Sequence, residues 1–265
     1  MSDLTTYERR QSLIELLRKQ PGLRVPELAK ALGISEGTVR NDLNALEQQG
    51  RLTRVYGGAV LNEQPQFPSP SFNIRYHKEA AEKMKIAQQA ALLVDDGDSI
   101  FLDASTTVYY LAQQLANRQR LRVVTNGIDV ARLMAENPTN MVILLGGTIG
   151  SDGSSITGVL SEQALQELHT QKAFVSCSGF SVERGMTEVH LAGAHLKRKV
   201  IVSAQQVIAL VGSNKLGKED LTSFAGINQI DQLFTDDGLS NEWHARLVQA
   251  GVPVTICSED SPVLL

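Results

Sequence analysis

The chain has 265 residues, of which 42% are hydrophobic and 20% charged, and its formal net charge is -4 at pH 7. A chain of this length exceeds the usual size of one domain, so we expect one large domain or two unequal ones around packed cores. The acidic balance excludes a protein that attracts nucleic acid non-specifically over its whole surface. Residues 1–62 are nevertheless slightly basic, with nine Lys and Arg against seven Asp and Glu.

Several other classes of protein are excluded by features that the sequence lacks. No run approaches the roughly 18 apolar residues of a membrane span, and the start "MSDLTTYERR" has no apolar centre of a secretion signal. Cys177 and Cys257 stand far apart and outside any C-x-x-C motif, which indicates packed thiols rather than a disulfide or a zinc site. We therefore expect a cytoplasmic protein with no membrane contact, no metal and no cofactor.

Residues 1–61 carry the pattern of three helices followed by a β-hairpin. The helices are expected in "YERRQSLIELLRKQ", in "VPELAKALG" with Pro26 in its first turn, and in "EGTVRNDLNALEQQ", which Ser35 caps. "RLTRVYGGAVL" alternates apolar and polar residues around a Gly-Gly turn, which is typical of a hairpin. This order predicts a small winged helix-turn-helix domain over residues 1–61.

The third helix has one apolar and one polar face. At about 100° per residue, Val39, Leu43 and Leu46 form a stripe that faces the core. The opposite face carries Gly37, Asn41, Asn44 and Gln48. Asn and Gln pair with adenine in the major groove, glycine permits close approach of the backbone, and neighbouring arginines suit phosphates. The alternative interpretation is an ordinary solvated helix face.

Residues 8–59, from "ERRQ" to "YGGA", resemble the N-terminal domain of DeoR-type transcriptional regulators. Residues 38–43 read "TVRNDL", where that family usually has "T-[IV]-R-R-D-L", and "YGGA" stands where it usually has "H-G-G-A". Asn41 and Tyr56 are thus departures from the family pattern. The resemblance implies double-stranded operator DNA as a partner. The DNA-binding candidates are Ser35, Gly37, Thr38, Arg40, Asn41, Asn44, Arg51, Arg54 and Tyr56.

A proline-rich segment separates this domain from the rest of the chain. Residues 62–73 read "NEQPQFPSPSFN" and hold three of the eight prolines. Because proline blocks helix and ladder hydrogen bonds, we place a linker over residues 62–77.

Residues 78–258 alternate short apolar runs with helical segments, and residues 259–265 form a tail. Seven runs are expected as strands: "DSIFLD", "LRVVTN", "MVILLGG", "KAFVSCSG", "QVIALVGS", "QIDQLFTDD" and "VPVTIC". Segments such as "TVYYLAQQLAN" and "NEWHARLVQAG" lie between them and have helical spacing. The alternation predicts an α/β domain with a mostly parallel, doubly wound sheet.

The residues that follow the strands are the candidates for a ligand site, because doubly wound sheets bind ligands beyond the carboxyl ends of their strands. Residues 103–107, "DASTT", open a helix whose free N–H groups and hydroxyls suit a phosphate, and Lys215 adds a positive charge from another run. Carboxylates and amides at the same edge suit sugar hydroxyls. The alternatives are that "STT" only caps its helix and that Lys215 is a solvated surface lysine.

The second half resembles the C-terminal domain of the DeoR family through "KIAQQAALLVDDGDSIFLDASTT", "VVTN", "LLGG", "GMT", "HLKRKVI" and "SNKLG". That domain is similar in fold to ribose-5-phosphate isomerase and glucosamine-6-phosphate deaminase. The resemblance implies a domain that senses a phosphorylated sugar or related metabolite and forms a homo-oligomer, a dimer or a tetramer. Ser105, Gly193 and Gly212 depart from the family, which usually has glycine at the first position and acids at the other two. The effector-binding candidates are Asp103, Ser105, Thr106, Thr107, Thr125, Asn126, Gly146, Gly147, Gly179, Thr187, Glu188 and Lys215.

Together the two modules predict a DNA-binding transcriptional regulator, with repression of a carbohydrate catabolic operon as the family's commoner mode. Two alternatives stay open at this point. One is a sugar-phosphate isomerase-like enzyme that uses Asp103, Glu188, Asp236 and Lys215 as acid, base and electrophile. The other is a DNA-binding protein whose sensor domain has lost its ligand.

Overall fold

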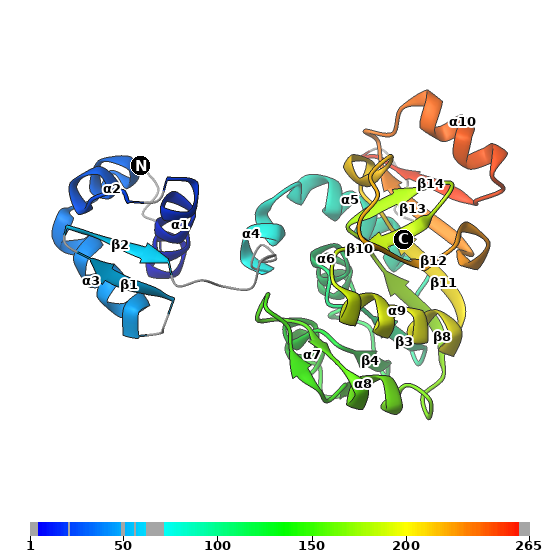
Figure 1. Cartoon of the computed structure of the whole chain (residues 1–265). Coiled ribbons are helices and arrows are strands. Elements are labelled where there is room, and N and C mark those ends of the chain that lie inside the picture. The colour runs from blue at the N-terminus through cyan, green and yellow to red at the C-terminus, as the bar shows by residue number, and fades with distance from the viewer. Residues whose placement is uncertain (1–4, 21, 49–50, 56, 62–71, 260–265) are drawn as a thin grey trace. The chain divides into compact units, whose positions relative to one another are not determined.

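The computed structural model describes residues 5–20, 22–48, 51–55, 57–61 and 72–259. The chain divides into two compact units, Met1–Pro68 and Ser69–Leu265 (Figure 1). Among the described residues, no helix combines the length and the apolar character needed to cross a membrane. In the same residues, no group of three or more His, Cys, Asp and Glu side chains is arranged to hold a metal ion.

The first unit is a three-helix domain with a hairpin, as the sequence predicts. Its elements are α1 (Thr6–Lys19), α2 (Val25–Leu32), α3 (Glu36–Gln48), β1 (Leu52–Val55) and β2 (Gly58–Leu61). Thr5 and Glu8 form a capping box at the start of α1, and Gly33, with φ of 65°, ends α2 in the left-handed conformation. The apolar faces of the three helices and the hairpin meet in one core that includes Leu13, Leu28 and Leu43, all 0% exposed.

A buried ion-pair cluster fixes α1 against α3. The Asp42 carboxylate, 2% exposed, accepts hydrogen bonds from Arg9 Nε at 2.5 Å and from Arg10 Nε at 2.9 Å. Burial alone would raise the pKa of Asp42, but the two guanidinium groups hold that pKa below its ordinary value. The cluster holds the register of α1 on α3 through side chains on the face of α3 that points away from solvent.

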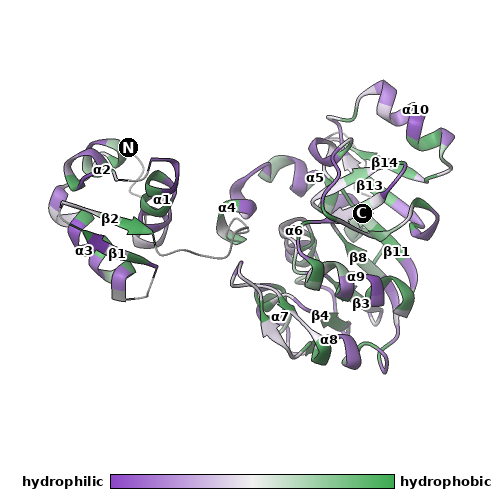
Figure 2. Cartoon of the chain, viewed as in Figure 1, coloured by the Kyte–Doolittle hydropathy of each residue, from purple (hydrophilic) through white to green (hydrophobic). Residues whose placement is uncertain are grey.

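The second unit is built on a seven-stranded sheet with strand order β14-β13-β11-β8-β3-β4-β5, in which every pairing is parallel. The strands are β3 (Ser99–Leu102), β4 (Arg122–Thr125), β5 (Met141–Leu144), β8 (Thr170–Val175), β11 (Ala204–Leu210), β13 (Gln232–Asp236) and β14 (Val254–Cys257). Each corresponds to one of the seven apolar runs, so the predicted strands and their parallel arrangement are confirmed. Figure 2 shows these strands as mainly hydrophobic.

Helices cover both faces of this sheet, so the doubly wound prediction is also confirmed. The helices are α5 (Ala80–Ala91), α6 (Thr106–Gln114), α7 (Ile128–Met134), α8 (Val159–Ala164), α9 (Leu191–Ser203) and α10 (Asn241–Gln249). Alternate residues of one strand enter different cores, because successive side chains of a strand point to opposite faces. Phe101 packs in the core that contains α9 residues, whereas Ile100 and Leu102 pack in the core that contains residues of α5, α6 and α7.

Smaller β-structures, which the sequence patterns do not predict, complete the second unit. A hairpin pairs β6 (Thr148–Ile149) with β7 (Ile156–Thr157), and an antiparallel sheet has the order β12 (Thr222–Ala225), β10 (Gly185–Glu188), β9 (Gly179–Ser181). Two short 3₁₀ turns, Ser213–Lys215 and Ile227–Gln229, follow β11 and β12.

Both cysteines are buried and free, in keeping with the predicted packed thiols. Burial raises the pKa of each thiol, Cys177 and Cys257, to about 12. At neutral pH neither side chain therefore carries the thiolate that a reactive cysteine needs.

Helix α4 (Phe72–His77) corrects the predicted extent of the linker, residues 62–77. The last proline of that segment is Pro70, so nothing in residues 72–77 blocks helix formation. The Tyr76 ring stacks on the Tyr110 ring of α6, with centroids 4.8 Å apart and planes at 10°. Residues 72–77 therefore belong to the second unit, whereas residues 62–71 and 260–265 lie outside the described part of the chain.

Candidate nucleic-acid interface and ligand cavity

The polar face of α3 has the composition and exposure of a surface that can enter a DNA groove. Val39 and Leu43 are 0% exposed and Leu46 is 2% exposed, which confirms the predicted apolar stripe. Gly37, Asn41 and Asn44 are exposed on the other side. The side chain of Gln48 and the whole of Tyr56, a predicted DNA-binding residue, lie outside the described residues.

Local hydrogen bonds fix the start of α3. Ser35 Oγ accepts the Thr38 N–H at 3.1 Å and lies 2.9 Å from the Thr38 hydroxyl, so these two predicted DNA-binding residues form the N-terminal cap of α3. Arg40, 55% exposed at its side chain, pairs with Glu36 at 2.6 Å. This exposed pair lies within one turn of the helix, and such pairs contribute little to stability.

The hairpin is joined to α3 by Arg54. Its guanidinium donates to the Asn44 side-chain oxygen and to the Gly58 carbonyl at 3.1 Å, and its backbone N–H donates to Glu47 at 2.6 Å. The structure therefore brings Asn44 and Arg54, two of the predicted DNA-binding residues, into contact. Arg51, also predicted, is half-buried, and its backbone N–H donates to the Leu46 carbonyl at 2.9 Å.

In the second unit, the three hydroxyls of "STT" have three different partners. Ser105 Oγ accepts the Val108 N–H at 3.2 Å and so caps α6. The Thr106 hydroxyl donates to the Arg75 carbonyl of α4 at 3.4 Å. Thr107 lines a cavity at the strand ends. The capping interpretation thus describes Ser105, and only Thr107 of the three faces the cavity.

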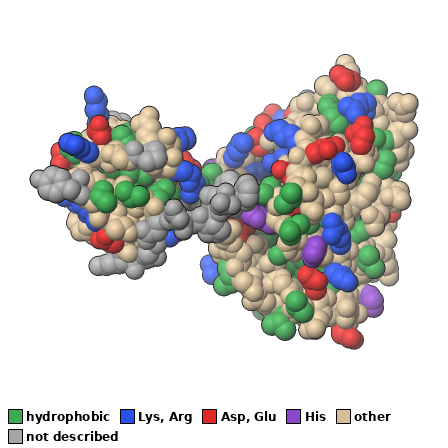
Figure 3. All heavy atoms as spheres, viewed as in Figure 1, with side chains coloured by type: hydrophobic (Ala, Val, Ile, Leu, Met, Phe, Trp, Pro, Cys, Tyr) green, Lys and Arg blue, Asp and Glu red, His purple; other side chains and the backbone are tan. Residues whose placement is uncertain are grey.

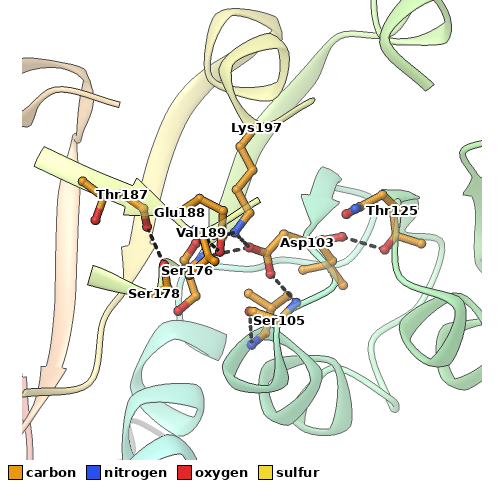
Figure 4. A network of polar contacts seen from close by, with 12 residues as sticks. Asp103, Ser105, Thr125, Ser176, Ser178, Thr187, Glu188, Val189 and Lys197 are labelled. Carbon is orange, nitrogen blue, oxygen red and sulfur yellow. Dashed lines mark hydrogen bonds and ion pairs between the residues drawn. The ribbon is translucent and has the colours of Figure 1, made fainter. Parts of the chain in front are cut away.

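Asp103 is the centre of a buried polar network (Figure 4). Its carboxylate, 1% exposed, accepts the Ser105 N–H at 2.8 Å and the Ser176 N–H at 2.9 Å, and lies 3.4 Å from Lys197 Nζ. Lys197, on α9, also contacts Glu188 at 2.7 Å and donates to the Ser176 carbonyl at 2.8 Å. Two predicted effector residues, Asp103 and Glu188, therefore share Lys197. This lysine lies on a helix, so a search for residues that directly follow the strands does not identify it.

The charges of this network stabilise one another. Burial alone would raise the pKa of Glu188, but the Lys197 charge and hydrogen bond hold it below its ordinary value. Burial alone would lower the pKa of Lys197, but Glu188 and Asp103 raise it above its ordinary value. Lys197 thus stays protonated and Glu188 ionised at neutral pH.

Most other predicted effector residues make contacts with the backbone of neighbouring loops. Thr125 Oγ1 donates to the Leu102 carbonyl at 2.6 Å, Asn126 Nδ2 to the Ile156 carbonyl at 3.1 Å, and Thr187 Oγ1 to the Gly179 carbonyl at 3.0 Å. These side chains hold the strand-end loops in place.

Glycines at two predicted effector positions are required by close packing. A Cβ at Gly147, where φ is 150°, would lie 2.4 Å from the Thr157 carbonyl oxygen, and a Cβ at Gly179 would lie 2.5 Å from the Lys218 carbonyl oxygen. The neighbouring Gly146 accepts a hydrogen bond from Ser161 Oγ at 2.6 Å. These three glycines therefore shape the loops rather than the wall of the cavity.

A cavity of about 220 Å³ lies between the first turns of α5 and the carboxyl ends of β8, β11 and β13. It is lined by Glu79, Glu82, Lys83, Ile86, Thr107, Ser176, Gly212, Ser213, Asn214, Lys215, Asp236, Asp237 and Gly238. Among the predicted effector residues, Thr107 and Lys215 are in this lining. Asp236 is held by Ser213 and Gly238, whose backbone N–H groups donate to its carboxylate at 2.7 and 2.9 Å.

Lys83 contributes a second positive charge to the cavity, at a position that no sequence pattern indicates. Its ammonium group donates to the Arg75 and Lys78 carbonyls, at the end of α4 and just beyond it. Burial, opposed by Glu79 and helped by the charges of Lys215, Arg75 and Lys78, lowers the pKa of Lys83 to about 8. In Figure 3, Lys and Arg side chains gather among acidic ones over α5. The cavity therefore holds two neighbouring ammonium groups that repel each other, together with the carboxylates of Glu79, Glu82, Asp236 and Asp237.

The fold and these two sites are those of a two-module regulator, and the comparisons with known proteins show which family it is. A family model described as "DeoR-like helix-turn-helix domain" matches residues 9–65, and one described as "DeoR C terminal sensor domain" matches residues 78–237. The chain belongs to the DeoR family of DNA-binding transcriptional regulators.

Relatives match over nearly the whole chain. "HTH-type transcriptional regulator GolR" of Listeria innocua is 35% identical over 94% of this chain and 98% of its own length. The "Lactose phosphotransferase system repressor" of Streptococcus mutans is 36% identical, with 86% and 91% covered. "HTH-type transcriptional repressor GlcR" of Bacillus subtilis is 33% identical, with 96% and 97% covered. Both modules are therefore shared with these proteins.

The matches among solved structures are more distant. Ribose 5-phosphate isomerase A from Neisseria gonorrhoeae aligns with a TM-score of 0.38 and 13% identity over 51% of this chain and 52% of that chain. The tetrameric eIF2B-beta2-delta2 complex from C. thermophilum aligns with a TM-score of 0.40 and 13% identity over 83% and 76%.

Proposed function

We propose that this protein is a repressor of a carbohydrate catabolic operon, and that a phosphorylated sugar or related metabolite bound in the second unit controls it. The observation that carries the proposal is the cavity at the strand ends, in which Lys83 and Lys215 are both part of the wall. Two of the relatives are named as repressors. A cavity of about 220 Å³ lies below the roughly 300–1,000 Å³ usual for drug-sized ligands, which suits a small metabolite.

Within the cavity, the phosphate is expected at Lys83, Lys215 and Thr107. Ammonium groups and a hydroxyl donate to phosphate oxygens, and hydrogen bonds to a charged acceptor are about twice as strong as neutral ones. The remaining wall offers acceptors and donors for sugar hydroxyls, chiefly Asn214 and Glu82. Asp103 and Glu188 are proposed to act indirectly, because their network with Lys197 positions the loops of Ser105 and Ser176.

Helix α4 is the element through which the ligand is expected to act on DNA binding. It is the first described element after residues 62–71, and Lys83 and Thr106 both donate to the Arg75 carbonyl within it. A phosphate that takes up the Lys83 ammonium removes hydrogen bonds from the end of α4. The protein then has two arrangements, one with and one without the hydrogen bonds from Lys83 to the end of α4. The change in DNA affinity is set by the difference between the ligand's affinities for these two arrangements.

At the operator, we expect α3 to enter the major groove with Asn41 and Asn44 toward the base edges. Arg40 and Arg54 are expected at phosphates, with Arg54 exchanging Asn44 for the DNA. Because phosphate contacts release counterions, binding should weaken as salt increases.

A gel-shift assay on DNA upstream of this gene and its neighbours tests the proposed operator binding by the first unit. We expect salt-sensitive binding by the full chain, at least tenfold weaker for Arg40→Ala and nearly unchanged for the matched control Lys19→Ala on α1, whose residue is exposed in the same unit. Equal binding by both variants would remove Arg40 from the interface.

Calorimetric titration with a panel of sugar phosphates tests the proposed ligand binding by the second unit. Heat is expected for at least one member and its loss in Lys215→Ala, and the same compound should release DNA in the gel shift. No heat with any member would favour a sensor domain without ligand. Aldose-ketose conversion by the purified protein, lost in Asp103→Asn, would instead support the enzyme alternative.

A further inference from the structure

Trp243, the only tryptophan of the chain, lies against the loop that carries Lys215, a residue of the cavity wall. A Cβ added to Gly217 would lie 3.0 Å from Cζ2 of Trp243, 3.7 Å from Cε2 and 3.8 Å from Nε1. The indole ring therefore packs directly on the backbone of this glycine. Because Gly217 is two residues from Lys215, the ring borders the loop close to the point where the lysine leaves it.

The backbone of this loop is also fixed on both sides of the lysine. Before it, Ser213 donates through its N–H and its hydroxyl to the Asp236 carboxylate, both at 2.7 Å. After it, the Gly217 N–H donates to the Phe180 carbonyl at 2.9 Å. Gly217 has φ of 79°, a conformation that glycine both adopts and leaves easily, because no side chain restricts its backbone. The indole ring supplies the restriction that the missing side chain would give.

Helix α10 holds the indole ring in this position. The Trp243 N–H donates to Ser240 Oγ, the N-terminal cap of α10, at 3.2 Å. Leu247, one turn further along, is 0% exposed and packs in the core that contains α9 residues. The Arg246 guanidinium lies 4.4 Å from the centre of the indole ring and pairs with Glu183 of the β9–β10 turn at 3.0 Å. The ring is thus fixed by its helix and by a cation–π contact.

The position of the Lys215 backbone limits what its side chain can bind. An ammonium group must come within about 2.7–2.9 Å of a phosphate oxygen to form a charge-assisted hydrogen bond. Lysine has a flexible four-carbon stem, so ordering it on a ligand costs conformational entropy. A loop whose backbone is held in one position lowers that cost, because fewer arrangements are lost when the ligand binds. Displacement of the loop should therefore weaken binding without removing any group that contacts the ligand.

We propose that Trp243 is a positioning residue for the ligand site, because its ring holds Gly217 and thereby sets where Lys215 meets the phosphate of a bound sugar phosphate. The inference rests on the proposed function, since it needs Lys215 to contact the ligand. It adds a residue of α10 to the ligand-binding machinery, although the described residues that line the cavity include none of that helix.

A double-mutant cycle tests whether Trp243 acts through Lys215. The probe is the member of a panel of pentose 5-phosphates and hexose 6-phosphates that gives the largest heat with the wild type in calorimetry. In the wild-type background, Trp243→Ala should weaken binding of this compound about five- to tenfold, because it costs part of a charge-assisted hydrogen bond. In the Lys215→Ala background the same change should weaken binding less than about twofold, because that hydrogen bond is already absent. Equal losses in both backgrounds would overturn the proposal.

Two further variants separate positioning from stability. Trp243→Phe keeps an aromatic ring against Gly217 and should bind within about twofold of the wild type. Leu121→Ala removes a side chain that is 0% exposed and directly precedes β4, at the end of the sheet opposite to the cavity. It should lower the denaturant midpoint of unfolding and leave the affinity nearly unchanged. An affinity of Trp243→Phe as low as that of Trp243→Ala, or an equal loss in Leu121→Ala, would contradict the positioning role.

Failure of the proposed function has a different signature from failure of this inference. Absence of heat with every sugar phosphate of the panel in the wild type would contradict the ligand site, and the inference with it. Heat that is lost in Lys215→Ala but unchanged in Trp243→Ala would contradict only the role of Trp243.

Discussion

Two lysines at the same edge of the sensor sheet have opposite environments. Lys197 contacts two carboxylates and a carbonyl, and its pKa is raised by Glu188 and Asp103 against burial. Lys83 contacts carbonyls of and beyond α4 and lies near Lys215, and burial lowers its pKa to about 8. Residues of the same types at strand ends thus form one closed ion network and one open cavity, whose wall holds two lysines among four carboxylates. The balance of charge around each lysine distinguishes the group that holds the fold from the group that we propose binds a ligand.

The largest effect is expected when the closed network loses its cation. Lys197→Met would leave Asp103 and Glu188 buried without a counter-charge, and breaking a buried ion pair in this way costs about 3–5 kcal/mol. Denaturant unfolding should show this loss, while the matched control Lys199→Met, exposed on the same helix, should change the free energy of unfolding by less than about 0.5 kcal/mol. Equal stability of the two variants would show that Lys197 does not hold the network.

Substitutions in the wall of the open cavity should change the affinity for the ligand and leave the free energy of unfolding nearly unchanged. Lys215→Ala removes one of two cations from the proposed phosphate site, and a charge-assisted hydrogen bond is worth about 1.5–3 kcal/mol, or roughly 10- to 100-fold in Kd. Calorimetry with the sugar phosphate that binds the wild type measures the change, and Lys218→Ala, an exposed neighbour, is the control. Loss of stability without loss of affinity would make Lys215 a structural residue.

The pH dependence of binding separates Lys83 from Lys197. The pKa of Lys83 is lowered to about 8 in the folded protein, compared with about 10.4 in an unfolded chain. Its charge therefore opposes folding below pH 8, and stability should rise between pH 8 and pH 10 as the folded state releases its proton first. A phosphate favours the charged form, so affinity should fall about tenfold from pH 7 to pH 9, where the phosphate charge is constant.

Lys83→Arg is the control for that profile, because arginine stays charged throughout this range. The variant should bind with nearly constant affinity between pH 7 and pH 9. If wild type and variant fall equally, another group causes the pH dependence and Lys83 does not contact the phosphate.

The parts of the molecule that depend on local pattern could be predicted from the sequence. All seven strands of the large sheet follow from apolar runs, and the buried stripe of α3 follows from the spacing of Val39, Leu43 and Leu46. The proline rule did not predict helix α4, because this helix packs through aromatic rings on α6, which no local pattern reveals.

The candidate site was predicted less completely, because it depends on which helix covers which strand end. Asp103 has the position of a ligand residue in the sequence, but its partner, Lys197, comes from a helix far along the chain. Lys83 lies on a helix that precedes its strand, and a rule that collects residues after strands cannot find it. The first turn of α5 lies over the ends of β11 and β13, and only the three-dimensional arrangement shows this.

The smallest predicted effects separate two roles within the "STT" loop: Ser105 caps helix α6, and Thr107 lines the cavity. Ser105→Ala removes the cap of α6 and should cost about 1 kcal/mol of unfolding free energy with little change in affinity, because the Ser105 hydroxyl accepts the Val108 N–H. Thr107→Val keeps the shape of a side chain in the cavity wall but removes its hydroxyl. It should weaken sugar-phosphate binding about fivefold and leave stability nearly unchanged. Thermal unfolding and calorimetry on the two variants measure both quantities, and the reverse pattern would place the capping hydroxyl, not Thr107, at the ligand.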